Sequence, residues 1–175
     1  MTGAPADPLP WQRAIADALV EAGVEAVAYV PDARLRGIVS ALEGRTLVRT
    51  LTREEECVGY ACGVTAAGGR SAVLMQCSGL GNALNALGSF AIPYALGIPL
   101  VLSMRGTLGE ENPSQVPMGR ATVALLATLG IQSHPVADPA RAGPTTTGVL
   151  ASAYAAGTTG AVILEPALGG QRESV

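Results

Sequence analysis

The two carboxylates of this sequence best placed for acid–base chemistry or ligand binding are Glu54 and Asp32, each of which comes shortly after an apolar run. If residues 54–67 form a helix, Glu54 shares a face with side chains that are all apolar: Cys57, Val58, Ala61 and Cys62. A carboxylate on an apolar face is costly unless it has a partner, so Glu54 is the stronger candidate. A cap or a solvated charge is the alternative, which Glu55 and Glu56 fit better. For Asp32 two roles stay open: a functional role, or that of N-cap for the next helix.

A glycine-rich segment, Gln76–Asn82 (QCSGLGN), follows another apolar run and precedes a helical pattern. Such a turn could hold a phosphate or an oxyanion, because the first N–H groups of a helix are free. The dinucleotide fingerprint needs a third glycine where Leu84 stands, and a Walker loop needs a Gly-Lys-Ser/Thr sequence that is absent. A nucleotide-binding module is therefore disfavoured, and a tight β–α turn is the alternative to an anion site.

The longest polar loop is predicted at residues 105–118 and contains Arg105, Glu110, Glu111 and Gln115. Long loops in compact domains are often functional. An arginine there could hold an anionic substrate through a bidentate pair. Solvated loop charges are the alternative.

Apolar runs and helical patterns alternate along the chain and predict the elements that position these residues. Strands are expected at 24–30, 46–51, 72–76, 99–104, 131–136 and 161–165, and helices at 11–22, 35–42, 54–67, 80–95, 122–129 and 139–157. The strand runs are continuously apolar, which indicates strands covered on both faces. We therefore predict a three-layer α/β fold: an open, mostly parallel sheet of about six strands with helices on both faces. Its ligand edge lies at the carboxyl ends of the strands, where the candidate loops meet.

Composition limits the classes of function. The 175 residues fit one domain, expected at 11–166, with a disordered leader at 1–10 and a loose tail at 167–175. A net charge of −3 without a basic stripe argues against nucleic acid. No apolar run reaches the ~20 residues that span a bilayer, and no signal peptide is visible, so we expect a cytoplasmic protein without membrane contact. Three cysteines and the single His134 predict no metal site.

Taken together, these motifs resemble the thiamine-diphosphate-dependent decarboxylases, in particular the α subunit of sulfopyruvate decarboxylase and the matching domain of phosphonopyruvate decarboxylase. The resemblance covers roughly residues 11–166. It is carried by Glu54, nine positions before Gly63, by the SGLGN block, and by Arg105-Gly106 with the segment QVPMG that begins at Gln115.

The resemblance implies that the chain is a pyrimidine-binding domain. Glu54 would hydrogen-bond N1′ of the aminopyrimidine of thiamine diphosphate and favour the imino form of its 4′-nitrogen, which activates the cofactor for removing carbon dioxide from a small 2-oxo acid. Asp32 would aid proton transfer. The implied cofactor contacts are Gln76, Ser78, Gly79, Leu80, Gly81 and Asn82 together with Glu54, and the implied substrate contacts are Arg105 and Gln115.

Relatives bind diphosphate and magnesium through a GDG motif that this sequence lacks. The resemblance therefore implies a separate β subunit that holds diphosphate and Mg2+, in a hetero-oligomer of α/β pairs. Met104 stands before Arg105 where relatives tend to have His or Trp. If that residue meets the substrate, a more apolar acid or a carboligase (acyl-transferring) half-enzyme stays open. A non-catalytic domain that only binds a partner is the alternative from another class.

Overall fold

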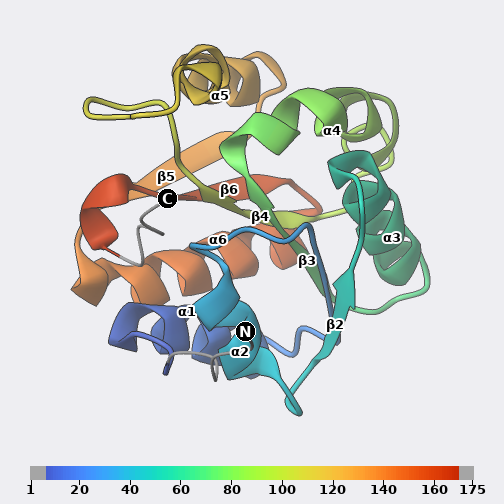
Figure 1. The fold of residues 1–175 in the computed structure, drawn as a ribbon. Coiled ribbons are helices and arrows are strands. Elements are labelled where there is room, and N and C mark those ends of the chain that lie inside the picture. The colour runs from blue at the N-terminus through green and yellow to red at the C-terminus, as the bar shows by residue number, and fades with distance from the viewer. Residues whose placement is uncertain (1–6, 170–175) are drawn as a thin grey trace.

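Six short strands form one parallel sheet in the order β2-β1-β3-β4-β6-β5 in the computed structural model, which describes residues 7–169 (Figure 1). The four inner strands are almost wholly buried, as their apolar runs predict: β1 (Ala26–Tyr29), β3 (Ser71–Gln76), β4 (Pro99–Ser103) and β6 (Gly160–Leu164). The predicted three-layer α/β fold with a parallel sheet is confirmed, and every strand pair is parallel.

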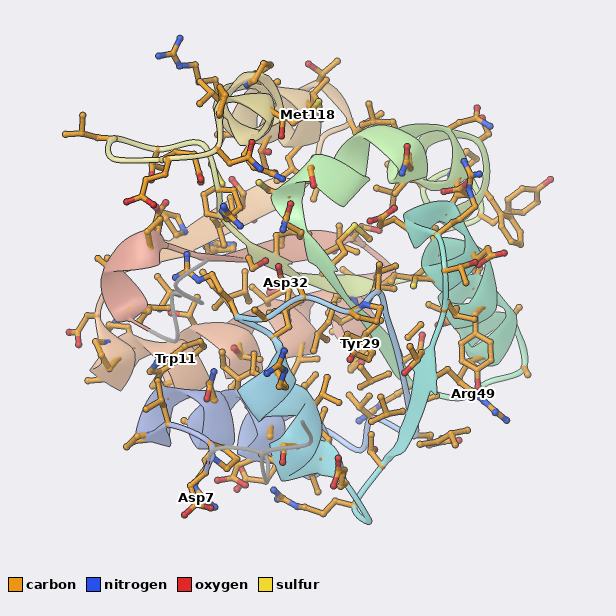
Figure 2. The ribbon with its side chains drawn as sticks, viewed as in Figure 1. Asp7, Trp11, Tyr29, Asp32, Arg49 and Met118 are labelled. Atoms are coloured by element: carbon orange, nitrogen blue, oxygen red, sulfur yellow. The ribbon has the colours of Figure 1, made fainter. Side chains whose placement is uncertain are left out.

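The two edge strands differ from the prediction. β2 (Leu47–Thr50) and β5 (Gln132–Val136) are largely exposed, so the expectation that all strands are covered on both faces is wrong for them. An edge strand has a neighbour on one side only, and the helical layers end near it. Arg49 on β2 accordingly reaches outward (Figure 2), and His134 on β5 is exposed.

Helices cover both faces of the sheet (Figure 1). On one face lie α1 (Pro10–Glu21), α2 (Arg36–Leu42) and α6 (Ala142–Ala156). On the other lie α3 (Glu54–Ala66), α5 (Val116–Thr128) and α4 (Leu80–Ala86), which continues as a turn of π-helix over Leu87–Ala91. Each layer has its own hydrophobic core against the sheet. Small aliphatic side chains dominate both cores, as the low aromatic content predicts.

The order of the strands creates a switch point between β1 and β3. The chain leaves β1 through α2 on one face to reach β2, and then returns through α3 on the opposite face to β3, on the other side of β1. At such a point the two connections diverge and leave a crevice outside the carboxyl ends of the strands, which is where open α/β sheets bind ligands. Asp32 follows β1 and Gln76 ends β3, so both lie there.

Several predicted boundaries need correction. α5 begins at Val116 rather than at 122, because Pro117 is well suited to a first helical turn, although the sequence pattern assigned it to the loop. A 3-10 turn at Pro166–Leu168 buries Leu168 in the core, so the folded unit extends past 166. α1 begins at Pro10, one residue early. Residues 1–6 of the predicted leader and 170–175 of the predicted tail lie outside the described residues.

Candidate active site

The Asp32 carboxylate receives hydrogen bonds from the ends of two other strands. Gln76 Nε2, at the end of β3, donates to Oδ2 at 3.0 Å, and Ser103 Oγ, at the end of β4, donates to Oδ1 at 3.0 Å. Ser103 is fully buried. Figure 2 shows Asp32 near the centre of the molecule, where these strands end. One carboxylate therefore ties together three neighbouring strands at the switch point.

Asp32 also closes a turn in its own loop. Its Oδ1 accepts the backbone N–H of Arg34 at 3.0 Å, which is an Asx turn. The N-cap position of α2 is Leu35, so the N-cap alternative for Asp32 is wrong, although the carboxylate does shape the turn before that helix. Asp32 thus accepts three hydrogen bonds from within the chain, and they restrict its rotation.

Arg34 is a residue of this edge that sequence reasoning missed. Its Nη1 donates to the carbonyl of Met104 at 3.1 Å and its Nη2 to the carbonyl of Glu165 at 2.8 Å, which joins the β1 loop to the ends of β4 and β6. Its Nε is buried and has no hydrogen-bond partner within residues 7–169. Burial lowers the pKa of the guanidinium, and the nearby Asp32 carboxylate opposes that shift. The only sequence signal was a cation two residues after Asp32.

Glu54 begins α3, and its first-turn neighbours take the roles expected of them. Glu56 Oε2 accepts the N–H groups of Thr52 and Arg53 at 3.3 and 3.2 Å, so this side chain caps the helix. Glu55 Oε1 accepts Arg53 Nε at 2.6 Å, and hydrogen bonds to backbone and to Arg53 lower the pKa of Glu55. The prediction that these two acids serve the helix start, and Glu54 does not, is confirmed.

The side chain of Glu54 lies against the glycine-rich segment. Its Oε2 accepts Asn82 Nδ2 at 2.9 Å, and its Cγ and carboxyl atoms occupy the space that a Cβ on Gly79 would need. The face that follows Glu54 along α3 is apolar and buried, as predicted. Within residues 7–169 no hydrogen bond to Glu54 Oε1 is formed, and the atom is not buried. This oxygen is an acceptor that a ligand could use.

The QCSGLGN segment combines polar contacts with core residues. Ser78 Oγ donates to Gln76 Oε1 at 2.6 Å, which links the segment to Asp32 through the amide of Gln76. Cys77–Gly79 form a 3-10 turn before α4. Cys77 and Leu80 are fully buried, so in this structure Leu80 supports the turn from the core. The tight β–α turn and the functional interpretation are therefore compatible.

Arg105 is held by a carboxylate of its own loop. Its Nε donates to Glu110 Oε2 and its Nη2 to Glu110 Oε1, both at 2.8 Å. Glu110 also accepts the N–H of Gly106 at 3.1 Å and that of Asn112 at 3.1 Å. These bonds lower the pKa of Glu110 to about 2 and raise that of Arg105. The bidentate contact predicted for a substrate anion is thus made here by Glu110.

The start of α5 packs closely on the Arg105 loop. A Cβ on Gly119 would collide with the Arg105 carbonyl, and one on Gly106, whose φ is +74°, would collide with backbone of Gln115. Gln115 Oε1 is buried, and no donor within residues 7–169 reaches it. Arg105 and Gln115 therefore lie together, as the prediction of a shared substrate role requires.

The side chain of Met104 bears on the substrate question raised above. It is only 7% exposed and belongs to the core between the sheet and α3, α4 and α5. A buried thioether in that core does not line the open edge. The apolar character of position 104 therefore gives no reason to expect an apolar substrate.

The structure brings most of the predicted residues to one edge of the sheet. Asp32, Gln76 and Ser78 form one hydrogen-bonded chain, and Ser78 precedes Gly79, against which Glu54 packs. Gly81 approaches the end of Met118, on α5, which Figure 2 shows above Asp32. Their roles toward cofactor and substrate stay predictions.

No group of three His, Cys, Asp or Glu side chains suited to a metal occurs within residues 7–169. No helix in that range is long and apolar enough to cross a bilayer.

The sequence is similar to those of several known proteins. Residues 11–110 match the family described as thiamine pyrophosphate enzyme, N-terminal TPP binding domain; thiamine pyrophosphate is another name for thiamine diphosphate. The sulfopyruvate decarboxylase subunit alpha of Methanococcus maripaludis is 39% identical over 121 residues, covering 68% of this chain and 72% of that protein. The sulfopyruvate decarboxylase of Methanosarcina acetivorans is 30% identical, covering 69% of this chain but 31% of that longer one.

Among solved structures, the 2-oxoglutarate:ferredoxin oxidoreductase from Magnetococcus marinus is similar in fold, with a TM-score of 0.66 over 93% of this chain. The identity is 12%, and the match covers 30% of that chain. At this identity the similarity supports the fold alone.

Proposed function

This chain belongs to the thiamine pyrophosphate enzymes, and from that premise we propose that it is the α subunit of a thiamine-diphosphate-dependent decarboxylase for a small 2-oxo acid. The observation that carries the proposal is the Glu54 carboxylate: one oxygen is held by Asn82, the other is open, and the side chain packs on Gly79. A bound thiamine diphosphate supplies the carbanion-stabilising centre on which a 2-oxo acid loses carbon dioxide.

The residues present fit the aminopyrimidine end of that cofactor. N1′ of the neutral aminopyrimidine carries no hydrogen, so Glu54 would share a proton with it: the carboxyl group would donate to N1′, and Oε1 would accept the N–H that results. Gly79 leaves room for the Glu54 side chain, which a side chain at position 79 would displace. Asp32 would hold or move a proton near the substrate, while Arg105 and Gln115 would contact its acidic group. Ser78 and Gly81 would contribute mainly backbone contacts along the ring, and Leu80 would support the turn from the core.

A partner subunit is part of the proposal. The sequence contains no GDG motif for diphosphate and magnesium. The related Methanosarcina chain is about three times as long as its matched region, which leaves length for a second domain. Two hollows within residues 7–169, one beside β5 and one between α1 and α6, lie away from Glu54. We therefore place the diphosphate and Mg2+ on a β subunit that covers this edge, in α/β pairs in the cytoplasm.

The decisive experiment compares two neighbouring acids in the complex with a β subunit. The complex is supplied with thiamine diphosphate, Mg2+ and sulfopyruvate, the acid named for the relatives, and carbon dioxide release is measured. Glu54→Gln should lower kcat by about 100-fold or more, a common size for loss of acid–base assistance. Glu55→Gln, one residue away but paired with Arg53, should retain activity within about twofold, as for a surface pair.

The alternatives predict other results. Full activity of Glu54→Gln would contradict the proposed role, and would fit a non-catalytic partner-binding domain. A carboligase would yield a product with a new carbon–carbon bond instead of the free aldehyde, which mass spectrometry of the products distinguishes. The burial of Met104 favours neither alternative.

A further inference from the structure

Gln76 is engaged at both ends of its amide by residues of this chain. Its Nε2 donates to Asp32 Oδ2 at 3.0 Å, and its Oε1 accepts from Ser78 Oγ at 2.6 Å. A contact between this amide and the cofactor would be limited to the second N–H of Nε2 or the second lone pair of Oε1. The amide therefore has a task inside the chain.

The orientation of the amide is determined from both sides. The Asp32 carboxylate only accepts hydrogen bonds when ionised, so the amide must turn its NH2 group toward it. The Ser78 hydroxyl then donates to the remaining carbonyl oxygen. A flipped amide would place its oxygen against the carboxylate oxygen, which is repulsive. Ser78 and Gln76 thus form a directed chain that ends on Asp32.

The contact also crosses the switch point of the sheet. Asp32 follows β1 and Gln76 ends β3, and these neighbouring strands are connected to opposite faces by α2 and α3. Ser103 and the Arg34 N–H both bind Oδ1, so Gln76 is the only described residue found to restrain Oδ2. Without that bond, Ser103 and the Arg34 N–H would still hold Oδ1, but Oδ2 could move as the carboxylate turns about its Cβ–Cγ bond.

We infer that Gln76 is a positioning residue that holds Asp32 Oδ2 in the orientation needed for proton transfer, rather than a contact to the cofactor. This inference rests on the proposed function, in which Asp32 serves the substrate. Ser78 acts one step further out, by fixing the amide of Gln76. Proton transfer depends steeply on donor–acceptor geometry, so a carboxylate that is present but rotated should lower kcat more than KM.

A double-mutant cycle in the reconstituted complex tests the inference, with sulfopyruvate as the probe. Gln76→Leu should lower kcat about 10- to 100-fold, the size expected for one hydrogen bond to a charged group, with KM changed less than about twofold. In an Asp32→Asn background the same substitution should change kcat less than about twofold, because the group it positions is already gone. Gln76→Glu, which keeps the size and the acceptor for Ser78, should lower kcat as Gln76→Leu does. Gln132→Leu, on the exposed edge strand, is the matched control.

An equal loss of kcat in both backgrounds would overturn the inference, and an increased cofactor Kd for Gln76→Leu would assign the residue to the cofactor instead. The hydrogen bond is checked separately in the full chain, without a partner. Of the five glutamines, labelled with 15N, one side-chain NH2 signal should shift in Asp32→Asn and be missing in Gln76→Leu. Absence of that shift would also overturn the inference. A wild-type complex that releases no carbon dioxide, with the NMR contact intact, would instead refute the proposed function and the inference that rests on it.

Discussion

Replacing Glu110 by Gln should loosen the Arg105 loop by an amount that can be worked from the structure. The carboxylate accepts four hydrogen bonds, two from Arg105 and one each from the N–H groups of Gly106 and Asn112. They lower its pKa from 4.5 to about 2, which corresponds to about 3 kcal/mol in full. The Arg105 side chain is 31% exposed, so solvent screening reduces the expected loss to about 1–2 kcal/mol. The neutral amide keeps one acceptor oxygen and places an NH2 group against the guanidinium.

The dependence on pH identifies the cause. The pKa of Glu110 is lower in the folded chain than in the unfolded chain, so its stabilisation is complete above about pH 4.5 and is lost as the pH falls through about 2. The difference in free energy of unfolding between the wild type and Glu110→Gln should therefore shrink over that interval, because the amide does not titrate. Urea unfolding of the full chain at pH 7, 4 and 2.5, followed by circular dichroism, measures this difference.

The loop could open without global unfolding, so hydrogen exchange supplies a local readout. The amide protons of Gly106 and Asn112 should exchange faster in Glu110→Gln at neutral pH, whereas Glu43→Gln, an exposed acid after α2, should leave them unchanged. A stability difference that is the same at pH 7 and pH 2.5, together with unchanged exchange of both amides, would refute the reasoning.

Three further expectations concern other parts of the chain. Gly79→Ala should keep the fold by circular dichroism but lose activity in the complex about as Glu54→Gln does, since its Cβ displaces the Glu54 side chain; retained activity would contradict this. The Cys57 thiol, whose pKa burial and the nearby acids raise to about 12, should resist iodoacetamide at pH 8 until urea is added, as judged by mass spectrometry. Leu74→Ala, in the middle of β3, should lower the free energy of unfolding by about 2–5 kcal/mol in urea, and a loss below 1 kcal/mol would contradict its burial.

The sequence predicted the strands and the odd position of Glu54 because both depend on local periodicity. An apolar run shows a buried strand, and a helix face can be counted from Glu54 without knowing what packs on it. The predictions of helix boundaries were wrong where one residue type occurs in two structural contexts. Pro117 ends a helix in one context and begins one in another, so α5 was predicted to start too late.

The partners of Asp32 could not be predicted in this way. Ser103 lies 71 residues away and Gln76 lies 44 residues away, and each looks like an ordinary polar residue at the end of an apolar run. Only the strand order brings them together, and that order depends on the handedness and face of each connection rather than on local pattern. The same applies to Arg34, whose acceptors are the carbonyls of Met104 and Glu165.

The two carboxylates of this edge differ in what they leave free, and that difference separates their roles. All three hydrogen bonds to Asp32 come from within the chain, two to Oδ1 and one to Oδ2, so one acceptor site, on Oδ2, is left for a ligand or a proton. Glu54 has one oxygen on Asn82 and one open, so it can accept a ring N–H at no internal cost. This difference supports the proposed division, in which Glu54 binds and activates the cofactor and Asp32 moves a proton near the substrate. The exchange of either acid for its amide should therefore have distinct effects: Glu54→Gln on cofactor binding and kcat together, and Asp32→Asn on kcat with cofactor Kd unchanged. Equal losses of cofactor affinity in titrations of the complex would contradict this division.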